Sequence, residues 1–240
     1  MFKWQGRIDN EDGLEGLRWH QKVDEHAYKE SGNLTSVNNS DKRATIDNTV
    51  TLVGFESDLG VAFNKGRTGA AAGPNAIRQA LSNLPWHWPN TSFTDLGNVT
   101  AVDNLAQAQT QYADAISYAL KQHTGFTIGL GGGHEIAWGS YQGLFNTKPE
   151  NARIGIINFD AHFDLRKPAL NTSSGTPFRQ VYDHCQLHNT PFYYACLGVS
   201  KAANTAALFN FANVSNTRYL TDMALNDESL CMQRIDELLS

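Results

Sequence analysis

The sequence predicts an α/β protein in which a mostly parallel sheet carries helices on both faces. Strand-like and helix-like segments alternate along the chain from about residue 50 onwards, and this order is typical of a parallel sheet. The 240 residues are 41% hydrophobic and 18% charged, which is the composition of an ordinary globular protein. Two polar segments follow strand-like runs, at the carboxyl ends where such folds place their sites.

Short apolar runs, several of them rich in β-branched or aromatic residues, indicate the strands. They lie at residues 49–55, 92–97, 125–130, 153–159, 191–199 and 217–220. The run RIGIINF at 153–159 is continuous, so we expect this strand to be buried.

Apolar residues at spacings of three and four indicate helices between these strands. The predicted helices cover residues 74–84, 103–121, 135–145, 201–211 and 226–239. Pro74 fits the first turn of its helix, and the polar segment 31–43 is expected to be a loop. The chain has no internal repeat and no low-complexity linker, so we expect one domain over residues 1–240.

Charge and composition narrow the class of protein. The net charge is −5 and no basic run could follow a phosphate backbone, so a nucleic-acid partner is not expected. No run approaches 18 apolar residues and the N-terminus lacks a secretory apolar segment, so neither a membrane span nor export is expected. Three cysteines without ligand spacing suit a reducing compartment. We therefore expect a cytoplasmic protein.

The segment NFDAHFDLR, residues 158–166, places two carboxylates and an imidazole directly after a predicted strand. On an extended chain, alternate residues face one side, so Asp160, His162 and Asp164 are expected to converge. Two carboxylates this close repel each other and are costly to desolvate. A cation among them would remove that cost; the alternative is a solvated polar loop.

A second segment, GLGGGHEIAWGS at residues 129–140, combines a glycine-rich turn with His134 at the start of a predicted helix. Glycines let the backbone turn tightly beside a ligand or another strand. The segment lacks the Lys-Ser or Lys-Thr of a P-loop and the GxGxxG pattern of dinucleotide-binding folds. Taken alone, His134 is better explained as a helix-capping or core histidine.

Together the two segments predict a metal site. They contribute two histidines and two aspartates at the carboxyl ends of strands that we expect to be neighbours. Imidazole and carboxylate ligands without thiolate suit a first-row metal, and the share of carboxylate favours Mn²⁺ over a structural Zn²⁺. A carboxylate can bridge two ions, so Asp160 could be shared by a pair that holds a bridging hydroxide.

Both segments resemble metal motifs of the ureohydrolase (arginase and agmatinase) family, GGGHE the first and DAHFD the second. The segments WQGRID, LRWHQ, NKGRTGAAAGPNAIR and DAHFDLR…SSGTPFRQ further resemble the members of this family that hydrolyse N-formimidoyl-L-glutamate. The resemblance runs from about residue 4 to the end of the chain. It implies an arginase-like, three-layer α/β/α fold around two Mn²⁺ ions per active site.

The resemblance also implies ligands and a reaction. His134, Asp160 and Asp164 would bind one Mn²⁺ ion, and Asp160 and His162 the other. The reaction would be hydrolysis of N-formimidoyl-L-glutamate to L-glutamate and formamide in histidine degradation, by attack of a metal-bridging hydroxide. Asp164 would be catalytic, because it could hydrogen-bond the hydroxide and carry a proton towards the departing nitrogen. Family members are usually homo-oligomers, so a homo-oligomer is expected.

A substrate with two carboxylates requires cationic or donor side chains beyond the metals, and a guanidinium suits carboxylate geometry. Arg166 and Arg179 are the candidates for that role, and Ser174 and Thr176 could add hydroxyl donors. Phe178 lies where arginases have a histidine, which argues against arginase itself. Weaker candidates in an earlier loop are Asn64, Lys65 and Arg67.

The family's third metal motif, a strand ending in Asp-x-Asp, is not found, since neither Asp222 nor Asp236 has that pattern. The C-terminal part of the domain is therefore expected to be missing, and the chain itself to be weakly active or inactive. Two alternatives stay open. One is a related ureohydrolase acting on a guanidino compound, and the other is an inactive fragment that keeps the fold but binds little metal.

Overall fold

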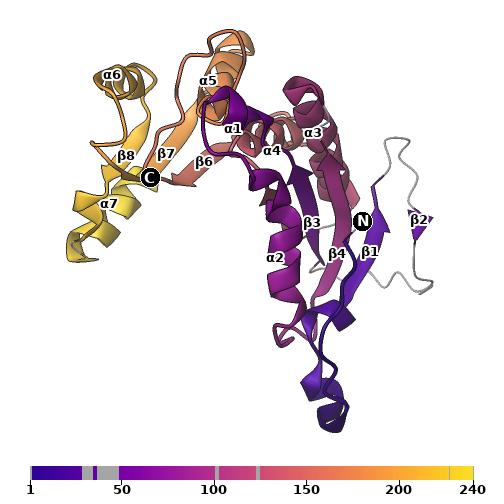
Figure 1. Cartoon of the computed structure of the whole chain (residues 1–240). Helices are drawn as coiled ribbons and strands as arrows, with labels where there is room; N and C mark the ends of the chain where they lie inside the picture. The colour runs from indigo at the N-terminus through magenta and orange to yellow at the C-terminus, as the bar shows by residue number, and fades with distance from the viewer. Residues whose placement is uncertain are drawn as a thin grey trace. The chain divides into compact units, whose positions relative to one another are not determined.

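The structure is a computed structural model that describes residues 2–28, 35–36, 49–100, 103–122, 125–226 and 228–239. The chain divides into two compact units, Met1–Thr147 and Lys148–Ser240. We call them the N-terminal and the C-terminal unit and describe each by itself (Figure 1). The predicted loop at 31–43 lies outside the described residues except for residues 35–36. The single domain over residues 1–240 stays a prediction.

The N-terminal unit contains a sheet with the strand order β2-β1-β4-β3-β5. All described pairs are parallel except β1 with β2. The strands are β1 (Val23–Ala27), β2 (Thr35–Ser36), β3 (Thr49–Glu56), β4 (Ser92–Thr100) and β5 (Thr127–Gly131). Its helices are η1 (Asn10–Gly16), η2 (Trp19–Gln21), α1 (Leu59–Phe63), η3 (Ala70–Ala72), α2 (Gly73–Ser82), α3 (Leu105–Gln122) and α4 (Ile136–Phe145).

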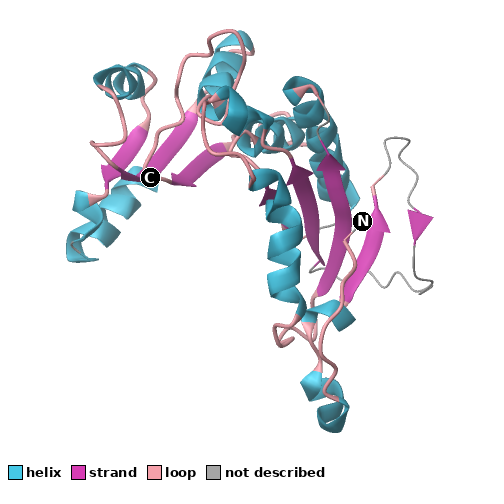
Figure 2. Ribbon diagram, viewed as in Figure 1, coloured by secondary structure: helices cyan, strands magenta, loops and turns pink. Residues whose placement is uncertain are grey.

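Helices cover both faces of this sheet because consecutive residues of a strand point to opposite faces. On β3, Leu52 packs with Leu81 of α2 and with the tryptophans Trp4 and Trp19. The next residue, Val53, packs with the apolar face of α3. The sheet thus lies between two helical layers, and α4 packs against α3. Figure 2 shows these helices flanking the strands of the N-terminal unit.

The C-terminal unit contains a second parallel sheet, of order β6-β7-β8. Its elements are β6 (Gly155–Phe159), α5 (Pro177–Leu187), β7 (Tyr193–Val199), α6 (Ala206–Val214), β8 (Arg218–Thr221), η4 (Met223–Asn226) and α7 (Glu228–Leu239). On β7, Tyr194 stacks on Phe178 of α5 at 4.3 Å between ring centroids. The adjacent Ala195 belongs to a cluster with Ile235 of α7. This sheet also has helices on both faces.

The predicted fold class is confirmed: the sheets are mostly parallel and layered with helices. The predicted strands and helices are found within a few residues of their expected ends. The elements that were not predicted are β1, β2, α1, α5 and the short helices η1 to η4. The prediction that 153–159 forms a buried strand was wrong for part of it: Ile157 and Phe159 of β6 are 48% and 79% exposed. In the described sheet, β6 pairs with β7 alone, so β6 is an edge strand.

Among the helices in the described ranges, none is both long and apolar enough to span a bilayer.

Candidate metal centre

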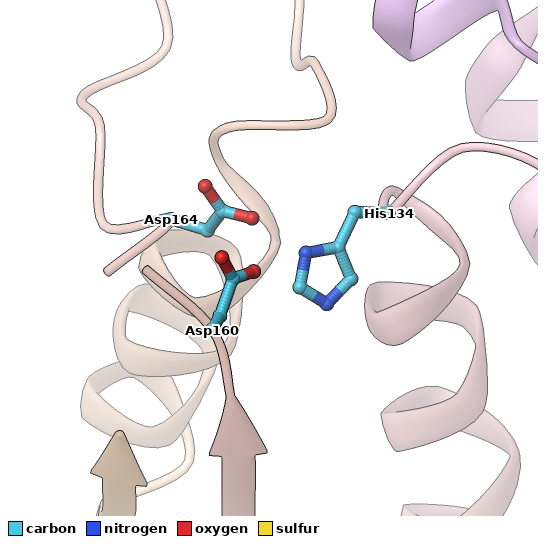
Figure 3. Close-up of side chains that lie close together, drawn as sticks. All are labelled: His134, Asp160 and Asp164. Carbon is cyan, nitrogen blue, oxygen red and sulfur yellow. The ribbon is translucent and has the colours of Figure 1, made fainter. Parts of the chain in front are cut away.

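Two of the predicted ligands lie close together just after β6. Asp160 and Asp164 are half-buried, and one carboxylate oxygen of each lies within 4.8 Å of the other. Figure 3 shows Asp160 at the tip of the β6 arrow and Asp164 on the loop that follows. Asp160 Oδ1 accepts the backbone N–H of His162 at 2.9 Å. Like charges this close repel each other, and a bound cation would relieve the repulsion.

The loop does not reach this arrangement as an extended chain. β6 ends at Phe159, and Asp164 has a φ of +47°, in the left-handed region. The convergence of Asp160 and Asp164 is thus produced by a turn rather than by the alternation of a strand. The His162 side chain is 52% exposed, and its Nδ1 lies 3.5 Å from Asp160 Oδ1. Its role as a metal ligand stays a prediction. Phe163 is fully buried, as expected for a residue that turns away from the carboxylates.

Neutral side chains from β6 and β7 hold the backbone of this loop. The Tyr194 hydroxyl donates to the carbonyl of Phe163 at 2.9 Å and accepts from Asn158 Nδ2 at 3.1 Å. The Cys196 thiol donates to the carbonyl of His162 at 3.3 Å. Burial raises the pKa of the Cys196 thiol to about 11 and raises the pKa of Tyr194 well above its usual value. Both groups are therefore neutral near pH 7.

In the N-terminal unit, His134 lies at the start of α4, as predicted, and is half-buried. The loop before it continues the pairing of β5 with β3. The Gly132 N–H donates to Phe55 O at 3.0 Å, and the Gly133 N–H donates to Ser57 O at 2.8 Å. The carbonyl of His134 accepts the N–H of Ala137, which begins the helix. The backbone that carries the imidazole is thus fixed on both sides.

The residue after His134 is a fully buried carboxyl group. Glu135 Oε1 accepts the N–H of Gly60 at 2.8 Å, while Oε2 has no hydrogen-bond partner within the part of the chain that the structure describes. Burial raises the pKa of Glu135, against a smaller lowering by its hydrogen bonds. A Cβ at Gly60 or Gly133 would lie within 2.5 Å of this carboxyl group. Glycines at these positions therefore leave the space that Glu135 occupies.

The predicted substrate residues lie in the C-terminal unit, in different surroundings. The Arg166 side chain is exposed, and the backbone N–H of Arg166 donates to Gly175 O at 3.0 Å. Ser174 is half-buried. The buried Thr176 hydroxyl is engaged locally, donating to Ser173 O at 2.9 Å. Arg179 donates to Asp183 at 3.1 Å and lies over the Phe211 ring, 3.9 Å from its centroid.

The substrate-binding roles predicted for these four residues stay predictions. The expectation that the two motif-bearing strands are neighbours also stays a prediction. β5 and β6 belong to different units, and the described pairs join β5 to β3 and β6 to β7 within those units. The sequence reasoning also did not single out the side chains that support the loops, namely Glu135, Asn158, Tyr194, Cys196 and Asn204. A buried polar residue far away in sequence gives no periodic signal, so nothing in the pattern marks it.

Comparisons with known proteins identify the class. The model of the arginase family matches residues 48–240, so the chain belongs to the arginase family. The formimidoylglutamase of Aeromonas salmonicida is 45% identical over 231 residues, which cover 96% of this chain and 68% of that protein. The formimidoylglutamase of Vibrio cholerae is 46% identical over 242 residues, with 95% and 66% covered. The chain thus spans about two thirds of the length of these curated relatives.

Solved structures show the same fold at lower identity. The formimidoylglutamase of Bacillus subtilis superposes with a TM-score of 0.74 at 19% identity, over 98% of this chain and 67% of that one. The formiminoglutamase of Trypanosoma cruzi, crystallised with Mn²⁺, gives a TM-score of 0.66 at 23% identity, over 76% and 63%. These likenesses establish the arginase-like fold of the chain.

Proposed function

We propose that this protein hydrolyses N-formimidoyl-L-glutamate to L-glutamate and formamide with the help of Mn²⁺, a reaction of histidine degradation. The observation that carries the proposal is the pair of carboxylates of Asp160 and Asp164, held within 4.8 Å on a fixed loop. The chain belongs to the arginase family, and its curated relatives at 41–46% identity are named formimidoylglutamase. The chemistry of these side chains and the names of the relatives support the same activity.

The donor set fits manganese. Carboxylate oxygens and imidazole nitrogens without thiolate suit Mn²⁺ and do not suit a structural zinc site. We propose that His134, Asp160 and Asp164 bind one ion and that Asp160 and His162 bind a second. When bound, such a pair of ions supplies Lewis-acid activation of water as a nucleophile at neutral pH.

The chain's own residues would then have the following roles. A carboxylate oxygen of Asp164 accepts the proton of the attacking water and passes it towards the glutamate nitrogen as the C–N bond breaks. Arg166 binds a substrate carboxylate, because it is exposed next to the metal loop and its guanidinium can make two parallel hydrogen bonds. Ser174 and Thr176 donate to the substrate, and Arg179 binds its second carboxylate. The last two roles require Thr176 and Arg179 to exchange their present partners.

Product analysis tests the reaction. The chain is incubated with MnCl₂ and N-formimidoyl-L-glutamate, and formamide and glutamate are measured; agmatine and 4-guanidinobutyrate are offered in parallel, with urea as the readout. We expect formamide to be the main product, even at a slow rate, and Asp160→Ala to abolish it. Urea as the main product would instead favour a ureohydrolase that acts on guanidino compounds.

Metal binding, assembly and location complete the proposal. We expect elemental analysis after dialysis against Mn²⁺ to find metal retained by the chain and lost in Asp160→Ala. We further propose a homo-oligomer in the cytoplasm, which light scattering on the purified protein and fractionation of cells would check. A chain that retains no Mn²⁺ at all would contradict the metal assignment and favour an inactive fragment.

A further inference from the structure

One side chain of the C-terminal unit bridges two peptide groups of the 160–164 loop from 41 and 43 residues away in sequence. Asn204 lies between β7 and α6 and is 8% exposed. Its Nδ2 donates to the carbonyl of Ala161 at 2.7 Å and to that of Ser200 at 2.9 Å. Its Oδ1 accepts the N–H of Phe163 at 3.1 Å. Both donor hydrogens and the acceptor of the amide are thus in use.

The two residues of the 160–164 loop that Asn204 contacts alternate with the proposed ligands. Ala161 and Phe163 lie between Asp160, His162 and Asp164 in the chain, so a side chain that fixes their peptide groups fixes the loop on which the carboxylates stand. β6 has ended at Phe159, so the loop's other support comes from β7, through the Tyr194 and Cys196 side chains. Directly after β7 ends, the Ser200 N–H donates to Ala161 O at 3.0 Å.

The loop needs such support because its backbone is unfavourable. The φ of Asp164, +47°, is rarely adopted by residues other than glycine, and such a conformation persists only where its surroundings over-determine it. Phe163 is fully buried, so its N–H has no access to water and requires a protein acceptor. Asn204 supplies that acceptor. An asparagine suits this position because it offers a donor and an acceptor on one short, flat group, whereas aspartate would present an oxygen to the carbonyl of Ala161.

We propose that Asn204 is a positioning residue for the metal centre: it holds the 160–164 loop in the turn that brings the Asp160 and Asp164 carboxylates together. This inference rests on the proposed function, since it concerns residues that we assign as Mn²⁺ ligands. Asn204 acts through the backbone, and none of its hydrogen bonds reaches a ligand side chain. Partners that hydrogen-bond the ligand side chains themselves typically change metal affinity 10–100-fold when they are removed, and we expect an effect of that order from a residue that fixes the ligands' backbone.

The test measures Mn²⁺ affinity by electron paramagnetic resonance of the free ion, in the full 240-residue chain. We expect Asn204→Ala to weaken Mn²⁺ binding by about 10–100-fold. Asn204→Asp keeps the acceptor for the Phe163 N–H but loses the donors to Ala161 and Ser200. We expect it to lose as much Mn²⁺ affinity as Asn204→Ala, or somewhat less. The matched control is Ser215→Ala, which removes another buried hydrogen-bonding side chain of the same unit, bonded to Ala212 O and Thr217. It should leave Mn²⁺ affinity unchanged, even where the thermal unfolding of both variants shifts alike.

A second measurement does not depend on metal. Hydrogen exchange of the Phe163 amide, followed by NMR in the absence of Mn²⁺, should accelerate in Asn204→Ala and stay slow in Ser215→Ala. Unchanged Mn²⁺ affinity in Asn204→Ala, or a Phe163 amide that remains protected, would overturn the inference. If the wild-type chain binds no Mn²⁺, the proposed function fails. If hydrogen exchange of the Phe163 amide still accelerates in Asn204→Ala, the inference that Asn204 holds the 160–164 loop is retained, but its link to metal binding is not.

Discussion

The two units contain buried polar side chains of different chemical kinds. In the N-terminal unit they include a carboxyl group and an ion pair: Glu135 follows His134 directly, and Arg78 and Asp95 pair in the interior. In the C-terminal unit, the side chains that hold the 160–164 loop are a hydroxyl, a thiol and amides. Both kinds satisfy buried backbone groups, but they differ in what happens when one member is lost.

Removal of one partner from a buried ion pair leaves a charge without compensation, which costs more than the loss of a neutral hydrogen bond. The N-terminal unit is thus expected to be the more sensitive to single substitutions of its buried polar residues. The C-terminal unit should lose stability in smaller steps. All five tryptophans lie in the N-terminal unit, so tryptophan fluorescence reports the unfolding of that unit alone.

The largest effect is expected from Asp95→Ala. Both Asp95 and Arg78 are 0% exposed, and Arg78 donates to the two oxygens of Asp95 at 2.8 and 2.7 Å. Asp95 also accepts from the Trp4 indole at 2.8 Å. The substitution leaves a buried guanidinium unpaired, so we expect a loss of about 3–5 kcal/mol in the free energy of unfolding. Urea unfolding followed by tryptophan fluorescence measures it.

The control for this substitution is Asp183→Ala in the C-terminal unit. Asp183 accepts from Arg179 at 3.1 Å, but its side chain is 54% exposed, and exposed ion pairs contribute about 0–1 kcal/mol. Urea unfolding followed by far-ultraviolet circular dichroism should give this variant a free energy of unfolding close to that of the wild type. A similar loss of free energy for both aspartates would mean that burial does not set the cost, and the contrast between the units would lose its basis.

Gly133→Ala is expected to come next in size. An added Cβ would lie 2.0 Å from Glu135 Oε2, in a space that the buried carboxyl group fills. Overpacking of this kind costs about 1–3 kcal/mol, and displacement of Glu135 would release the Gly60 N–H that it accepts. We expect weaker Mn²⁺ binding together with the lower stability, because the loop that carries His134 shifts.

Gly155→Ala is the matched control for Gly133→Ala. Gly155 lies on β6 in the C-terminal unit, and a Cβ there meets no atom within 4 Å. Its stability and Mn²⁺ affinity should stay near those of the wild type. Equal losses at both glycines would contradict the explanation based on space, and would indicate a general intolerance of added side chains.

The sequence allowed the strands, the parallel order and the two ligand-bearing loops to be predicted, because periodicity and strand-end position are local signals. It also placed His134 correctly at the start of a helix. The same local view failed at Asp164, where the left-handed backbone replaces the expected extended chain. It missed α5, whose residue Arg179 was considered only as a candidate for binding the substrate. Contacts such as that of Asn204 with Phe163 depend on how the chain folds back, and no spacing in the sequence encodes them.

Tyr194→Phe tests the neutral side of the comparison and should have a smaller effect than Asp95→Ala. The substitution removes only the hydroxyl that bonds Phe163 O and Asn158. Each neutral hydrogen bond contributes about 0.5–1.5 kcal/mol, so for two we expect a loss of about 1–3 kcal/mol in the free energy of unfolding of the C-terminal unit, measured by circular dichroism. Tyr182→Phe is the control, because ring contacts with Phe192 and Phe211 are its described interactions. A loss as large as that of Asp95→Ala would contradict the division between charged and neutral support.

The smallest effect concerns pH and a histidine in the C-terminal unit. Burial, together with the neighbouring His188, lowers the pKa of His184 below its usual value of 6.5. The unfolded state then binds more protons than the folded state as the pH falls through 6.5, so stability contributed by neutral His184 is present above that pH and is lost below it. We expect His184→Gln to flatten the pH dependence of unfolding between about pH 6.5 and 5, within the ordinary titration range of histidine.

Circular dichroism melts of the wild type and His184→Gln across that range measure this difference, and His188→Gln separates its two causes. If burial is the larger cause, His188→Gln should retain most of the acid sensitivity that His184→Gln removes. If His188→Gln removes the acid sensitivity to the same extent, repulsion between the two imidazoles is the dominant cause, and the C-terminal unit contains a charge-dependent element of its own. The contrast between charged and neutral buried side chains would then hold only for the two ligand-bearing loops. It would no longer describe the two units as wholes.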